Sequence, residues 1–239
     1  MPAFRMMLLA LKRLYEELFH LLLMGLLTIL GYLLLSIPAV WLLLSLQAPW
    51  PLIALAGLLL SLPGAIANAG LWGVAQAIVK ETTSISWPFY WKAIKSQWKL
   101  SVSSYVLILA GYLLILSNLL FYNTTLSPLP PHLNPWAIGI WAGLGVLWSG
   151  IAFYLLAFQM ELEKPKLLLA LRNSFLMVLL HPIEVFIWLV TFAVCSVLMV
   201  FLPLLIALIP PLAAILSFGA LQVFLEPIRE KQQSATDKE

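Results

Sequence analysis

Residues 60–99 read LSLPGAIANAGLWGVAQAIVKETTSISWPFYWKAIKSQWK. No charge interrupts this stretch before Lys80, which is typical of a helix that crosses a membrane. Residues 80–84 are hydrophilic, and tryptophans and lysines then recur from Trp87 to Lys99. Tryptophan prefers the headgroup zone of a bilayer, and lysine extends its ammonium group out of lipid. The stretch therefore predicts a spanning helix, its exit into water and a short helix in the membrane surface.

The composition supports lipid as the solvent of the whole chain. Of the 239 residues, 63% are hydrophobic and 10% are charged, whereas a soluble domain has about 25% charged residues. A single cysteine, Cys195, excludes an intrachain disulfide, and three scattered histidines do not form a metal site with it at any usual spacing. No catalytic or phosphate-binding motif occurs. We therefore expect an all-α integral membrane protein without enzymatic activity, metal or cofactor.

The apolar runs predict one membrane domain over residues 1–226 and a frayed, charged cytoplasmic tail over 227–239. Six spans are expected within the domain, with kinks at Pro38, Pro63 and Pro210-Pro211. Their predicted bounds are about 19–46, 52–79, 100–122, 136–160, 183–202 and 204–225.

The placement of the cations predicts the sidedness of these spans. All 13 lysines and arginines lie before span 1, between spans 2 and 3, between spans 4 and 5, or after span 6. Positive loops stay in the cytoplasm. The pattern therefore predicts both termini in the cytoplasm and an even number of crossings of the cell membrane.

Short amphipathic helices are predicted on the cytoplasmic side before spans 1, 3 and 5, over residues 4–18, 86–99 and about 166–180. Similar places in them are occupied by Lys12, Lys92 and Arg172, each 80 residues from the next. One interpretation is a three-fold repeat of helical hairpins, and the other is coincidence among hairpins of similar length. The repeat units would be about 1–80, 81–163 and 164–226.

Two sets of residues are expected to hold the helices in place. The second amphipathic helix supplies interfacial anchors, for which we discount nucleic-acid binding because the helix is short and lies between two spans. These anchors are Trp87, Trp91, Lys92, Lys95, Trp98 and Lys99. Small residues at four-residue spacing predict close helix packing in lipid, and they are Ala65, Ala69, Gly73, Ala77, Gly139 and Gly143.

The remaining polar residues allow a structural and a functional interpretation. Asn68 and Gln76 are amides within a predicted span, where they either bond neighbouring helices or contact a solute. A second set would lie at the cytoplasmic mouth, with Arg172 paired to Glu184, and would either cap the interface or form a site. It comprises Arg172, Asn173, Ser174, His181 and Glu184.

Three short blocks resemble the YesL-like family of bacterial multi-pass membrane proteins, whose activity is not established. They are residues 61–81 (SLPGAIANAGLWGVAQAIVKE), 89–95 (FYWKAIK) and 170–175 (ALRNSF) with 180–182 (LHP). The chain departs from the family pattern at residues 64–68, where GAIAN replaces a run with threonine and proline. The resemblance implies the bacterial inner membrane and an accessory role beside carbohydrate uptake.

Two functions of different classes follow. The first is an accessory or permease-like component of small-solute uptake, with a sugar-uptake system as partner. The second is a structural or regulatory scaffold that binds partner membrane proteins, which predicts an exposed face at Gly139 and Gly143.

Overall fold

The structure is a computed structural model that describes residues 12, 15–80, 86–123, 129–130, 132–162, 166–201 and 203–236. The described part of the chain is helical throughout, without strands. Its elements in order are α2 (Leu18–Leu33), α3 (Ser36–Ser45), α4 (Trp50–Leu60), α5 (Leu62–Lys80), α6 (Trp87–Tyr122), α7 (Asn134–Glu161), α8 (Leu167–Leu180), α9 (Pro182–Val200), the 3₁₀ helix η1 (Pro203–Leu208) and α10 (Ile209–Thr236).

Two helices form the centre of the molecule. In α5, 67% of the most apolar 18-residue window is buried, and the corresponding window within Ile206–Leu225 is 61% buried. The two helices meet where the rings of Trp72 and Phe218 pack edge to face, with centroids 5.6 Å apart. Helices α2, α6, α7 and α9 each pack against one or both members of this pair, whereas α3 and α4 pack mainly on each other and α8 packs on α7.

Several helices are long and apolar enough to cross a membrane. Within the described residues there are five: Leu18–Ser45, Leu62–Lys80, Trp87–Tyr122, Asn134–Glu161 and Ile206–Leu225. The pair α8 and α9 adds a sixth if it is counted as one span, because the two helices pass the same test together across a 99° bend. The chain therefore has the build of an all-α multi-pass membrane protein.

Two of the predicted kinks are breaks between helices. The first predicted span is divided into α2 and α3 at Leu34–Leu35, four residues before Pro38. Proline has no N–H to donate to the carbonyl four residues earlier, so the helix opens there. The second span is divided in the same way, because Ser61 separates α4 from α5 and lies two residues before Pro63.

At Pro210-Pro211 the change from η1 to α10 falls directly before the prolines, whereas the prediction of a frayed tail is wrong. Both prolines lie in the first turn of α10, where a missing N–H breaks no hydrogen bond. The same helix continues through residues 227–236. This segment is rich in Glu, Lys, Gln and Arg, which are strong helix formers.

The predicted interfacial helix over 86–99 and the predicted span over 100–122 are parts of one helix. Helix α6 runs from Trp87 to Tyr122 without a break, since no proline or glycine falls between Pro88 and Gly111. Helix α8, by contrast, ends at Leu180 before His181-Pro182, as proline requires of the residue that precedes it. Most of the helix predicted over 4–18 lies outside the described residues.

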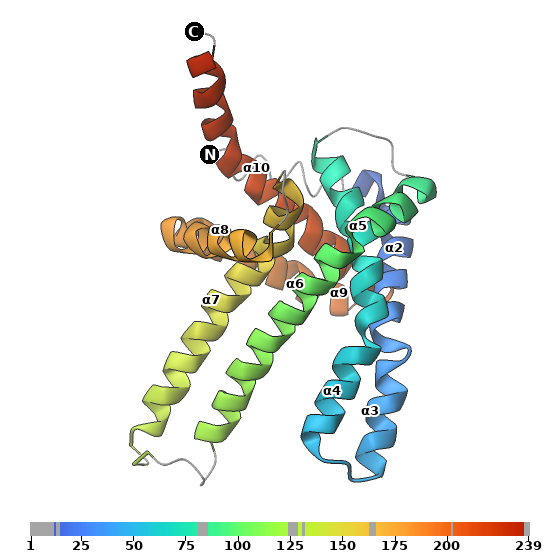
Figure 1. Ribbon diagram of the computed structural model, residues 1–239, viewed down its shortest axis with the longest axis vertical. Coiled ribbons are helices and arrows are strands. Elements are labelled where there is room, and N and C mark those ends of the chain that lie inside the picture. Colours follow the sequence, from blue (N-terminus) through green and yellow to red (C-terminus); the bar gives the residue numbers. More distant parts are fainter. Residues whose placement is uncertain are drawn as a thin grey trace.

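Figure 1 shows that the helix ends separate into two groups. One group lies toward the upper end of the view, from which α10 extends. It consists of the end of α5, the start of α6, the end of α7 and helix α8. The turn between α3 and α4, the end of α6 and the start of α7 lie at the opposite end. The described lysines and arginines from Lys80 to Arg172 belong to the first group.

Candidate functional site

A charged cluster joins the end of α5 to the end of α7. The Nζ atom of Lys80 lies 2.7 Å from Oε2 of Glu161, and Gln76 donates from Nε2 to the same oxygen at 3.2 Å. Gln76 also lies 3.4 Å from the carbonyl oxygen of Met160. The Glu161 side chain is only 11% exposed, so its charge depends on these partners. The cluster ties two helices together near one end of the molecule.

Below this cluster, hydroxyls on one face of α6 bond to neighbouring helices. Ser101 donates to the carbonyl oxygen of Ala65 at 2.7 Å, and Tyr90 donates to that of Ala67 at 3.1 Å. Ser104 donates to Oε1 of Gln159 on α7. Such bonds satisfy polar groups that would otherwise be costly in hydrocarbon. None of these residues belongs to the predicted sites, although an isolated amide such as Gln159 in an apolar run is a signal that the sequence contains.

The two predicted intramembrane amides differ in their surroundings. Gln76 belongs to the charged cluster, where its contacts join helices. Asn68, two turns earlier on α5, is half-buried, and its side chain has no hydrogen-bond partner within the described part of the chain. Asn68 is therefore the one of the two that has capacity left to contact a solute or another molecule.

The described members of the predicted cluster at the cytoplasmic mouth have different surroundings. Arg172 is exposed and Asn173 half-buried, whereas Ser174 is buried and donates to the Ala170 carbonyl oxygen at 2.9 Å. The ring of His181 packs on Phe224 of α10, with centroids 4.5 Å apart. The side chain of Glu184 lies outside the description, and so does its predicted pairing with Arg172.

The predicted anchors lie on the first four turns of α6. Trp91 and Trp98 are 49% and 41% exposed, and all three lysines of the set are exposed. Trp87 is half-buried and packs edge to face on Tyr90. The anchors thus face outward, while Tyr90 and Ala93 on the other side of the same turns are buried.

Most small residues of the predicted packing set lie against other helices. Ala65 and Ala69 are fully buried and Ala77 is 5% exposed. A Cβ built on Gly73 would lie 2.5 Å from the Cβ of Ala93 on α6, so these two helices approach closely because Gly73 has no side chain.

Gly139 and Gly143 are the exception in the predicted packing set. Both are exposed on α7, and a Cβ built on either meets no atom of another element within 4 Å. Packing at these glycines was predicted from sequence, but no described helix of this chain covers them. A small-residue face leads to close packing only where a second helix is present.

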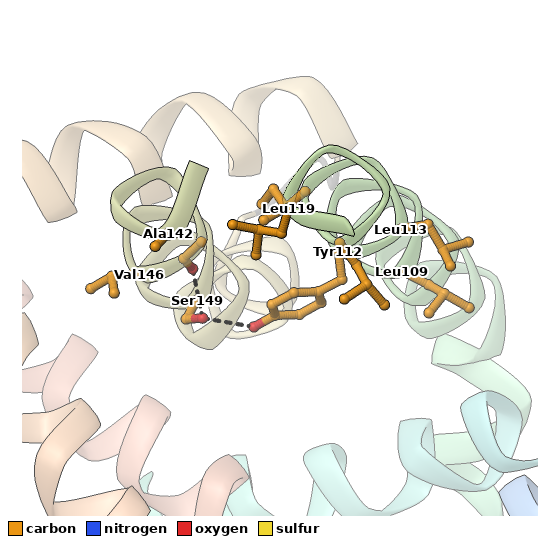
Figure 2. Close-up of a pocket in the computed structure, with 10 residues that line it drawn as sticks. Leu109, Tyr112, Leu113, Leu119, Ala142, Val146 and Ser149 are labelled. Carbon is orange, nitrogen blue, oxygen red and sulfur yellow. Dashed lines mark hydrogen bonds between the residues drawn. The ribbon is translucent and has the colours of Figure 1, made fainter. Parts of the chain in front are cut away.

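An apolar groove lies next to these glycines, between α6 and α7. Its volume is about 490 Å³, and Leu109, Tyr112 and Leu116 line one wall while Ala142, Val146 and Ser149 line the other. Figure 2 shows Tyr112 reaching across to Ser149, to which its hydroxyl donates at 3.0 Å. Ser149 in turn donates to the Gly145 carbonyl oxygen at 2.8 Å. The groove has no charged lining residue and suits a hydrocarbon or helix surface.

Comparison with known proteins adds no relative to this description. No protein-family model, no curated protein and no solved structure matches the chain. The fold by itself defines the class, an all-α protein with five or six candidate membrane spans. The resemblance to the YesL-like family stays a prediction.

Proposed function

We propose that this chain is a non-enzymatic, multi-pass membrane protein that binds a helix of a partner membrane protein and serves as its accessory scaffold. The supporting observation is the contrast among its glycines. A Cβ on Gly31, Gly70 or Gly73 would lie within 3.0 Å of a neighbouring helix, whereas Gly139 and Gly143 have no such neighbour. Gly57 and Gly145 are intermediate, since a Cβ there would make ordinary contact at 3.5 Å. A helix of another molecule would supply the missing contact at Gly139 and Gly143.

The adjoining groove extends the surface offered to a partner. Ala142 and Val146 lie one helical turn apart and close to the face of Gly139 and Gly143. A partner helix would place its ridge along the glycines and its larger side chains between α6 and α7. In lipid, helix–helix contacts are stabilised by van der Waals packing and not by the removal of water. The fit between small and large residues therefore decides the affinity.

A photoreactive amino acid at Ala142 tests this proposal in native membranes. We expect a crosslinked adduct heavier than the chain by the mass of one partner protein, and its loss in Gly139→Leu/Gly143→Leu. Because a Cβ at either position meets no atom of the described residues within 4 Å, the variant should keep its own fold. Ala110→Leu, also exposed but on α6, is the matched control and should leave the adduct intact.

Two outcomes would overturn the scaffold proposal. Adducts with lipid alone would mean that the groove holds acyl chains. An adduct of twice the mass of the chain would mean that a second copy, and not a different protein, covers the face.

Direct participation in small-solute uptake, carbohydrates included, is the second candidate. The observation that favours it is Asn68, whose half-buried amide has no side-chain partner among the described residues although it lies on the most buried helix. Asn68→Leu should then lower uptake in a strain that lacks the native gene, at an unchanged amount of protein in the membrane. Gln76→Leu is the comparison, because it removes a helix contact and should lower that amount. Unchanged uptake in Asn68→Leu would rule out a permease role for this amide.

The proposed topology has six crossings of the bacterial inner membrane, with both termini in the cytoplasm. The grouping of the cationic helix ends in Figure 1 supports it. Single cysteines at Gln47 and His132 should react with an impermeant reagent from outside the cell, and one at Lys92 should not. Reaction of Gln47 or His132 from the same side as Lys92 would refute the topology. The repeat of three hairpins is a further proposal, which superposition of the three helix pairs tests.

A further inference from the structure

The first turns of α6 carry a cationic face, consisting of Lys92, Lys95, Lys99, Trp91 and Trp98. The three lysines recur at i, i+3 and i+7, so they lie along one side of the helix. All five side chains are exposed. The opposite side of these turns is covered by α5 and has no room for a ligand, as the contact between Gly73 and Ala93 shows.

The charge of this face is not neutralised by the described part of the chain. The ion pairs there are Lys12 with Glu16, His20 with Glu17 and Lys80 with Glu161. None of the three lysines of α6 takes part in one. Helix α6 has no Asp or Glu over its 36 residues, so no carboxylate on its own helix competes for them.

The tryptophans place this charge at a definite depth. Trp91 and Trp98 flank the lysines, and the Nζ atom of Lys99 lies 5.7 Å from the ring centroid of Trp98. Tryptophan rings of this kind lie at the headgroup level of a bilayer. After Lys99 the same helix continues without charge to Tyr122, which is a length that hydrocarbon requires. The lysines are therefore held level with the lipid phosphates.

We propose that the cationic face of α6 binds the phosphate headgroups of anionic phospholipids in preference to zwitterionic ones. Positive charge without an ion-pair partner among the described residues, depth at the phosphates and an apolar continuation for the acyl chains together fit this ligand. A basic cluster beside a spanning helix attracts anionic lipid by about fivefold per cation at low ionic strength. The occupant is the lipid of the membrane itself, and the proposal does not depend on a protein partner.

Reconstitution of the full chain in phosphatidylcholine vesicles tests this. Spin-labelled phosphatidylglycerol and spin-labelled phosphatidylcholine are the probes, and the fraction of each that is immobilised by the protein is measured by electron paramagnetic resonance. The wild-type chain should immobilise phosphatidylglycerol several-fold more strongly, and the preference should fall as salt is raised. The variant Lys92→Gln/Lys95→Gln/Lys99→Gln should lose most of it, and Lys→Arg at the same positions should keep it.

A matched control separates this face from overall charge. Arg229→Gln/Lys231→Gln/Lys238→Gln removes the same three charges from the C-terminal tail and should leave the preference unchanged. The proposal is overturned if the tail variant loses as much as the α6 variant, or if the α6 variant keeps the preference. It is equally overturned if the wild-type chain shows no preference at low salt, an outcome that needs no variant to fold.

Discussion

Helices α2 and α5 cross at a point where their backbones are in contact. Adding a single methyl group at this crossing should force the two helices apart. A Cβ built on Gly31 lies 2.8 Å from both Cα and N of Gly64 and 3.1 Å from the carbonyl carbon of Pro63. These are backbone atoms, which cannot rotate aside. Since ordinary contact begins near 3.4 Å, the helices must move apart by about 0.6 Å. Overpacking of this kind costs about 1–3 kcal/mol, of which alanine regains up to about 1 kcal/mol through its helix propensity.

We therefore expect Gly31→Ala to lower the free energy of unfolding by about 1–2 kcal/mol, and Gly31→Leu to lower it further. The assay is titration of the protein from mild detergent into dodecyl sulfate, followed by circular dichroism. Gly139→Ala is the control, because its Cβ meets no other element, and it should be neutral or slightly stabilising. Equal stability of Gly31→Ala and the wild-type chain, or an equal loss in the control, would refute the close crossing of α2 and α5.

Two further predictions concern polar contacts and use the same titration. A double-mutant cycle of Lys80→Met with Glu161→Gln should give a coupling free energy of about 1 kcal/mol. This coupling should weaken as salt is raised, because the Lys80 side chain is 32% exposed. The control cycle of Lys95→Met with Glu161→Gln, which removes an exposed lysine, should give no coupling. Ser104→Ala should lower the free energy of unfolding by about 0.5–2 kcal/mol, because it leaves the Gln159 oxygen unpaired in the interior. Adding Gln159→Leu should recover part of that loss. Unchanged stability of Ser104→Ala would contradict the buried hydrogen bond.

The sequence indicated where the prolines divide the helices. Pro38, Pro63 and Pro210 lie in the first turn of α3, α5 and α10, where a missing N–H breaks no hydrogen bond. In each case the preceding element, which is α2, α4 or η1, ends within five residues before the proline. The sequence did not indicate that the element before Pro210 is a 3₁₀ helix.

The candidate site was less predictable than the helices. Gln76 was predicted to be an amide in lipid, but its partner Glu161 is 85 residues away and lies just beyond the predicted span 136–160. Gly139 and Gly73 have the same kind of sequence environment, yet one is open and the other closely packed. Spacing identifies the face of a helix that carries small residues, and it does not identify the helix that covers the face.

The sequence by itself determined that this is an all-helical chain with segments apolar enough to cross a membrane, and roughly where those segments lie. These properties depend on local composition, on proline and on the length of apolar runs, which act within a few turns of a helix. Only the tertiary structure decided that α5 and α10 are central, that Glu161 binds Lys80 and Gln76, and that the glycines of α7 remain open. When apolar helices pair in lipid, no water is removed from their surfaces, so the hydrophobic effect does not select the partner. The pairing therefore depends on the fit of whole surfaces, which no single segment contains.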